Sequence, residues 1–348
     1  MEALNVALGS DFVTYPWGVG AATGIGSLPY DDSDEAARVV TGELPGLPHL
    51  PELAQRGVGA DMIGRTASLL VDMHVDLQPA GWRLTDRSGS DERRAAALLR
   101  VDLDALEIAA LGYSGPLKVQ VAGPLTLAAS IERPRGDRAI ADYGARRDLA
   151  QSLAEGVREH VAEVAKRVPG AQVVVQVDEP TLPAVLAAAI PTSSGFGRLR
   201  AVDVSEAEQL LGAVIGAAWE WPVVHCCAAE APVRLVQRAG ARALALDVSL
   251  LSGRVLDELT EAVDGGLALW PGVVPSRRPD SVPAIRDLVA RIDRLFSRLD
   301  ADPARMAAVT VVTPSCGLAN ADIGWAREAY RLARETARAF AESVGEAG

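Results

Sequence analysis

Histidine and cysteine are scarce in this chain, which has four histidines and three cysteines among 348 residues. Three cysteines in a chain of this length do not form a disulfide framework, so we interpret them as thiols, metal ligands or core residues. Residues 1–16 contain no basic segment followed by a sustained apolar run, and we expect no signal peptide. A long uncharged stretch, residues 180–197, is interrupted by prolines and small polar residues, so we expect no membrane span. These absences predict a cytoplasmic protein.

Basic residues are also few relative to acidic ones. The chain has 34 Lys and Arg against 46 Asp and Glu, a net charge of −12 at pH 7. Such a surface repels phosphate backbones and anionic lipid, so we expect neither a nucleic-acid nor a membrane partner. The chain has no linker, no internal repeat and no low-complexity segment, and we expect one domain over residues 1–348. No oligomeric state is predicted.

One pattern recurs along the chain: a short apolar, β-branched run followed by an alanine- and arginine-rich stretch with helical spacing. This pattern predicts βα units. The predicted strands are KVQVAG (118–123), VVVQVDEP (173–180), PVVHCC (222–227), ALALDVS (243–249), LALWPGVV (267–274) and AAVTVVTPSCG (307–317), with TGIGSLP (23–29) as the first. For the second strand, LPHLPEL (47–53) is the candidate, and GWRLTDR (81–87) competes as part of a hairpin.

The predicted helices support a barrel. Residues 150–168 and 321–344 have an apolar face and a charged back, which is typical of a barrel's outer ring. About eight βα units in ~350 residues match an α/β fold, a single (β/α)8 TIM barrel with N-terminal and loop insertions. A doubly wound sheet is the rival, but GIGSLP places Pro29 where its glycine fingerprint needs a glycine.

Polar residues gather where the predicted strands end. They are Ser27, Asp178, Glu179, His225, Cys227, Asp247 and Cys316. In a barrel the carboxyl ends of all strands open on one face, where active sites of this fold are built. We therefore expect these side chains to converge.

His225 and Cys227 are two residues apart, so on a strand they point to one side and Cys226 points to the other. We expect Cys226 to be a packing residue. The imidazole, the Cys227 and Cys316 thiolates and the Asp247 carboxylate make a tetrahedral zinc set. The alternative is that His225 and Cys227 are two semi-buried residues without a metal, since cysteine is among the most buried residue types.

Six stretches in this order carry a family resemblance: GIGSLP (24–29), VAGPLTLAAS (121–130), QVDEPTLP (176–183), His225-x-Cys227, the strand-end acid Asp247 and TPSCGL (313–318). Together they resemble the catalytic, C-terminal barrel of cobalamin-independent methionine synthase. The matching stretches run from about residue 23 to residue 325, nearly the whole chain.

The resemblance implies a zinc-dependent methyltransferase that activates a small-molecule thiol, homocysteine, as a thiolate. It implies that His225, Cys227 and Cys316 bind zinc, with Asp247 as a fourth, exchangeable ligand. It also implies that Ile25, Gly26 and Ser27 hold the carboxylate of homocysteine and that Asp178 holds its ammonium group, with Glu52 as a further candidate for the amino group. Asp178 and Asp247 are the candidate catalytic residues.

The sequence also departs from that family. The family has glutamate where Asp247 stands, a tryptophan near Ala128 or Ala129, and a histidine that acts as a proton donor near Arg277 or Arg278. An arginine does not act as an acid near pH 7. The full-length enzyme has two barrels, and this chain has room for one.

Three functions stay open. The first is methionine formation from homocysteine with a methylated corrinoid, supplied by a partner protein, as the donor instead of methyltetrahydrofolate. The second is corrinoid-dependent methylation of another thiol, such as coenzyme M. The third is a metal-free protein resembling uroporphyrinogen decarboxylase, in which Arg56, Arg65 and the Arg277–Arg278 pair bind acidic groups; these arginines are otherwise solvated or paired surface charges.

Overall fold

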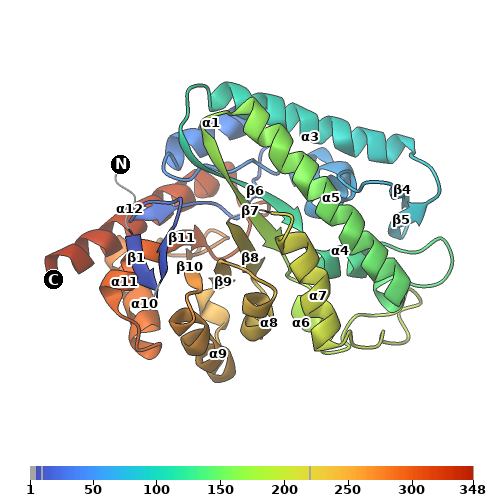
Figure 1. Ribbon diagram of the computed structural model, residues 1–348. Helices are drawn as coiled ribbons and strands as arrows, with labels where there is room; N and C mark the ends of the chain where they lie inside the picture. Colours follow the sequence, from blue (N-terminus) through green and yellow to red (C-terminus); the bar gives the residue numbers. More distant parts are fainter. Residues whose placement is uncertain (1–4, 9–10, 219–220, 348) are drawn as a thin grey trace.

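Seven parallel strands form the central sheet of the protein, whose computed structural model describes residues 5–8, 11–218 and 221–347 (Figure 1). In spatial order they are β3 (Ala21–Ala22), β11 (Val311–Pro314), β10 (Ala268–Val274), β9 (Ala243–Asp247), β8 (Pro222–Cys226), β7 (Ala171–Asp178) and β6 (Gly115–Ala122). Neighbouring strands pair in parallel throughout. The strands are rich in Val, Leu and Ala and nearly all their residues are buried, as parallel sheets covered on both faces require.

Helices surround the sheet on its outside (Figure 1). They are α1 (Ser33–Glu43), α2 (Met62–Ala67), α3 (Ser90–Ala109), α4 (Pro124–Ser130), α5 (Tyr143–Arg167), α6 (Leu182–Leu186), α7 (Val204–Ile215), α8 (Val233–Arg238), α9 (Gly253–Asp264), α10 (Ile285–Arg298), α11 (Pro303–Val309) and α12 (Ile323–Ala347). The two helices predicted at 150–168 and 321–344 are confirmed within α5 and α12. No helix in the described part of the chain is long and apolar enough to cross a bilayer.

The two edges of the sheet, β3 and β6, are joined by an extended segment, residues 48–52. It exchanges two backbone hydrogen bonds with Lys118 of β6, and Glu52 exchanges two more with the loop after β3. Pro48 and Pro51 have no backbone N–H, so the segment makes isolated bridges instead of a continuous strand. The sheet is therefore curled, and the architecture is consistent with a TIM-like barrel.

Two hairpins lie outside the central sheet. β1 (Asn5–Leu8) pairs with β2 (Asp11–Thr14), and β4 (His74–Gln78) pairs with β5 (Gly81–Thr85), both antiparallel. The sequence GWRLTDR thus forms a hairpin strand, which was the alternative prediction for residues 81–87.

The first predicted strand, 23–29, lies just after the observed β3, and the last, 307–317, is longer than the observed β11. Only Ala21–Ala22 is a strand near the predicted 23–29 segment, because Gly26 has a φ of +155° and the chain there turns into a loop. The prediction was also wrong for residues 307–309, which belong to α11. Asp302 accepts a hydrogen bond from the Ala304 amide and Pro303 stands at the first helical position, so a helix begins here despite the apolar sequence.

Candidate metal centre

Three predicted ligands meet at the carboxyl ends of β8 and β11. The ligand atoms of His225, Cys227 and Cys316 all lie within 4.8 Å of one another. His225 is on β8, Cys227 follows its last residue, and Cys316 lies two residues beyond β11. One imidazole nitrogen and two thiol sulfurs form a donor set that suits zinc.

A buried carboxylate orients the His225 ring. Nδ1 of His225 lies 2.7 Å from Oδ1 of Asp178, and both side chains are almost fully buried. In the neutral ring, the Nδ1 proton is donated to Asp178 and the lone pair is on the buried Nε2. A histidine whose second nitrogen is held by a carboxylate is the usual arrangement of a metal ligand.

The thiols of Cys227 and Cys316 shift each other's pKa in opposite directions. The Sγ atoms of Cys227 and Cys316 lie 2.9 Å apart. The contact with Cys227, together with His225, lowers the pKa of Cys316 to about 5, and the contact with Cys316 raises the pKa of Cys227. Cys316 therefore loses its proton first, and the thiolate is the form that binds metals.

Cys226 and Asp247 have other roles in this structure. Cys226 is 1% exposed and burial raises its pKa to about 12, so its predicted role as a packing residue is confirmed. Asp247 ends β9 but is not a member of the three-residue group. Its Oδ1 accepts hydrogen bonds from the amide and the hydroxyl of Ser249, at 2.9 and 2.6 Å. Metal binding by Asp247 stays a prediction.

The loop after β3 lies against the loop that carries Cys316. The amide of Leu318 donates to the carbonyl of Ser27 at 2.8 Å, and a Cβ on Gly317 would collide with the Ser27 hydroxyl. The amides of Gly26 and Ser27 donate no hydrogen bond to any residue in the described ranges. The predicted carboxylate-binding loop therefore lies beside the predicted metal ligands and has two amides available.

Glu52 closes the other side of this loop. Its backbone bridges to Ser27, and its side chain is 5% exposed. Burial raises the pKa of Glu52 to about 7, although Arg65 opposes this shift. Glu52 and Asp178 are thus two buried acids near the same loop.

Glu179, the second acid of the DEP stretch, has a local structural role. Its carboxylate accepts hydrogen bonds from the amides of Leu125 and Thr126 and from the Thr126 hydroxyl, at 2.7 to 2.9 Å. It therefore holds the start of α4, and among the strand-end acids Asp178 alone contacts the metal-ligand group directly.

Three polar residues of the barrel interior were missed by the sequence interpretation. Lys118, Gln120 and Gln176 are at most 4% exposed. Nε2 of Gln176 donates to Oδ1 of Asp178 and to the carbonyl of Ile25, both at 2.8 Å. The signal was present in KVQVAG and VQVDEP, where polar residues recur at every second strand position and so face one side.

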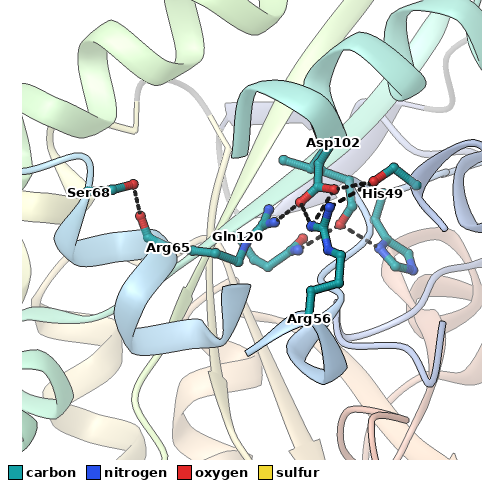
Figure 2. Close-up of polar contacts among 8 residues, drawn as sticks. His49, Arg56, Arg65, Ser68, Asp102 and Gln120 are labelled. Atoms are coloured by element: carbon teal, nitrogen blue, oxygen red, sulfur yellow. Dashed lines mark hydrogen bonds and ion pairs between the residues drawn. The ribbon is translucent and has the colours of Figure 1, made fainter. Parts of the chain in front are cut away.

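Arg56 and Arg65, predicted either to bind the acidic groups of a ligand or to lie at the surface, are instead paired with a buried acid of the protein. Asp102 of α3 lies between Arg56 and Arg65 (Figure 2). Its carboxylate accepts from Nη2 of Arg56 at 2.6 and 2.7 Å, from Nη1 of Arg65, and from the Ser33 hydroxyl. Asp102 and Arg65 are 1% and 4% exposed, so this is a buried structural ion cluster, and it leaves little support for a decarboxylase-like acid-binding site.

Replacing Asp102 with alanine should destabilise the fold strongly. Removing one partner of a buried ion pair costs about 3–5 kcal/mol, because the remaining charges stay buried and unpaired. Urea unfolding followed by circular dichroism measures the change. Asp104→Ala, on the same helix, is the matched control: Asp104 pairs with Arg167 but is 63% exposed, so it should cost about 0–1 kcal/mol. Equal losses in the two variants would contradict the assignment.

Comparison with known proteins places the chain in a family. The family model described as "Cobalamin-independent synthase, Catalytic domain" matches residues 20–339. Among solved structures, a B12-independent methionine synthase from Shewanella sp. W3-18-1 in complex with selenomethionine has 13% identity and a TM-score of 0.59, covering 94% of this chain and 98% of that one.

A mutant tryptophan synthase α-subunit from Pyrococcus furiosus has 12% identity and a TM-score of 0.38, covering 95% of this chain and 98% of that one. No curated protein matches the chain. Because the family model covers most of the 348 residues, the chain belongs to the family of cobalamin-independent synthase catalytic domains and is a methyltransferase.

Proposed function

We propose that this protein transfers a methyl group to the thiol of homocysteine and so forms methionine. The observation that carries the proposal is the group of His225, Cys227 and Cys316 within 4.8 Å, beside a loop with two available amides. The family match supports methyl transfer. We also propose that the whole chain is one barrel, in which residues 48–52 serve as the eighth strand.

The metal end of the proposed site consists of Nε2 of His225 and the Sγ atoms of Cys227 and Cys316, which would hold one zinc ion. When bound, zinc lowers the pKa of a substrate thiol and holds its sulfur in place. Asp178 keeps the proton on Nδ1 of His225, which leaves Nε2 available. Asp247 is the proposed exchangeable fourth ligand; its Oδ1 accepts both hydrogen bonds from Ser249, so its Oδ2 would bind the zinc.

The amino-acid end of the proposed site lies beside the proposed metal ligands, where the Gly26–Ser27 loop contacts the loop that carries Cys316. The amides of Gly26 and Ser27 and the Ser27 hydroxyl would bind the substrate carboxylate. Asp178 uses Oδ1 for both His225 and Gln176, so its Oδ2 is left for the substrate ammonium, with Glu52 as the second acid. Methyl transfer then forms a sulfur–carbon bond from a sulfur lone pair, and the electrons of the broken bond stay on the donor.

A methylated corrinoid on a partner protein is the proposed methyl donor. Arg278, near the place of the family's proton-donating histidine, is paired with Asp322 at 2.9 Å. Burial lowers the pKa of His49 to about 3 and that of His160 to about 4, so neither supplies a proton near pH 7. A corrinoid leaving group needs no proton, whereas the tertiary amine of methyltetrahydrofolate does.

Ligand binding tests the amino-acid end directly. Methionine and homocysteine should raise the melting temperature of the zinc-loaded protein, and coenzyme M, a thiol without an amino group, should raise it much less. Asp178→Asn should weaken methionine binding by about ten- to a hundredfold, since a hydrogen bond to a charged group is worth about 1.5–3 kcal/mol. Isothermal titration calorimetry at saturating zinc measures this loss.

Asp203→Asn is the control for that experiment, because Asp203 is an exposed acid at the start of α7. It should leave methionine binding unchanged. Equal stabilisation by homocysteine and by coenzyme M would contradict homocysteine as the substrate and favour methylation of another thiol. Unchanged methionine affinity in Asp178→Asn would contradict the assigned contact with the ammonium group.

A further inference from the structure

Lys118 is unusual for this protein in both type and position. Of the 34 Lys and Arg residues, only Lys118 and Lys166 are lysine. Lys166 is exposed on α5, whereas Lys118 lies on β6 inside the barrel and is 0% exposed. A buried ammonium group is costly unless it is paired and hydrogen-bonded, so its partners are informative about its role.

The ammonium group of Lys118 is bonded to the predicted carboxylate-binding loop. Nζ donates to the carbonyl of Ile25 at 2.9 Å and to Oε1 of Gln120 at 3.2 Å. The same Ile25 carbonyl accepts from Nε2 of Gln176 at 2.8 Å. Two interior side chains on neighbouring strands therefore hold one peptide group from inside the barrel.

This contact determines where the next amide points. In a trans peptide the carbonyl and the following N–H point in opposite directions. Because Lys118 and Gln176 draw the Ile25 carbonyl toward the barrel interior, the Gly26 amide is directed away from them. Gly26 has a φ of +155°, and a Cβ there would collide with Gln120, so this loop conformation depends on glycine.

The charge of Lys118 is balanced by acids of the proposed site. Burial lowers the pKa of Lys118 to about 7, and the buried carboxylates of Asp178 and Glu52 counteract that shift. The lysine therefore also offsets two negative charges that face the same loop. Its hydrogen bonds act on the predicted carboxylate-binding loop, and its charge acts on Glu52 and on Asp178, which also holds His225.

We propose that Lys118 is a positioning residue, whose hydrogen bond to the Ile25 carbonyl directs the Gly26 amide toward the carboxylate of the amino-acid substrate. The inference rests on the proposed function, since it assumes an amino acid at this loop. It extends that function by assigning the carboxylate specificity to a buried side chain that does not touch the substrate.

The test compares two ligands on the full-length, zinc-loaded chain by calorimetry. They are methionine and 3-(methylthio)propylamine, which is methionine without its carboxylate. Lys118→Met keeps most of the side-chain length and removes the donors and the charge. It should weaken methionine binding by at least about tenfold, leave amine binding within about twofold, and leave zinc content unchanged. Lys166→Met is the matched control and should change neither ligand's affinity.

A second measurement uses the wild-type protein and so does not depend on whether Lys118→Met folds. With only two lysines in the chain, ¹⁵N labelling at Nζ gives two assignable signals. The Lys118 signal should move more when methionine binds than when the amine binds. Lys118→Gln, which keeps a neutral donor, should show a smaller loss of methionine affinity than Lys118→Met.

The outcomes separate this inference from the proposed function. A wild-type protein that binds methionine no better than the amine would overturn both. A wild-type preference for methionine that persists in Lys118→Met, or a loss that is equal for the two ligands, would overturn the positioning role alone. A Lys118 signal that does not respond to methionine would overturn it as well.

Discussion

Replacing Cys227 or Cys316 with serine is expected to abolish stoichiometric zinc binding. Zinc content should fall from about one ion per chain to less than about a tenth, because each variant removes one of three soft ligands. Methyl transfer should fall by at least about a hundredfold in the same variants, more than is typical for changes outside the ligand set. Metal analysis of protein purified without added zinc, followed by an activity assay, measures both effects.

Cys226→Ala is the matched control for these variants. Cys226 is adjacent in sequence to Cys227 but is buried on the other side of β8. It should keep its zinc and most of its activity. Full zinc content in both Cys227→Ser and Cys316→Ser would contradict the metal centre, and zinc loss in Cys226→Ala would contradict the assignment of its side chain to packing.

Methylcobalamin is expected to support methionine formation from homocysteine, whereas methyltetrahydrofolate should be a poor donor. A positioned general acid contributes about 10²- to 10⁴-fold to a rate, and the folate reaction needs one for its amine leaving group. Arg278 is exposed and paired with Asp322 where the family has its histidine. The folate reaction should therefore be at least about a hundredfold slower, measured as methionine formed by the same zinc-loaded protein.

Two comparisons make that donor experiment decisive. Cys316→Ser with methylcobalamin measures the methylation of homocysteine that proceeds without the metal centre, and this background should be small. Efficient turnover of wild-type protein with methyltetrahydrofolate, whether mono- or polyglutamated, would contradict the proposed donor. It would show that another group supplies the proton.

The strand prediction succeeded where burial on both faces of the sheet requires a continuous run of apolar residues. Val-, Leu- and Ala-rich runs at 173–180, 222–227, 243–249 and 267–274 each correspond to an observed strand within a few residues. It was less accurate where local chemistry overrides the apolar pattern. Pro303 and the Asp302 cap start a helix before β11, and two prolines interrupt the extended segment at 47–53. Propensity alone does not rank these competing effects.

The convergence of His225, Cys227 and Cys316 could be predicted because the first two are two residues apart at the end of one strand and the third follows the end of another. His225, Cys227 and Cys316 are also rare residue types in this chain. Their electrostatic surroundings could not be predicted in the same way. The pairing of Asp178 with His225 joins residues 47 positions apart, and the burial of Arg65 against Asp102 joins α2 to α3. Such contacts depend on tertiary packing and leave no local pattern in the sequence.

Backbone hydrogen bonds are not distributed evenly around the sheet, because residues 48–52 make only isolated bridges to its two edges. β8, which carries His225, is hydrogen-bonded along its length to strands on both sides, so His225 lies on the stiff part of the sheet. The loop with Gly26 and Ser27 is joined to the neighbouring wall through Glu52 by isolated bridges. Segments with fewer backbone hydrogen bonds open at lower free-energy cost. Opening at Glu52 should therefore cost less free energy than opening at β8, so we expect the Gly26–Ser27 loop to shift together with the Leu318 segment bonded to it while His225 keeps its place on β8.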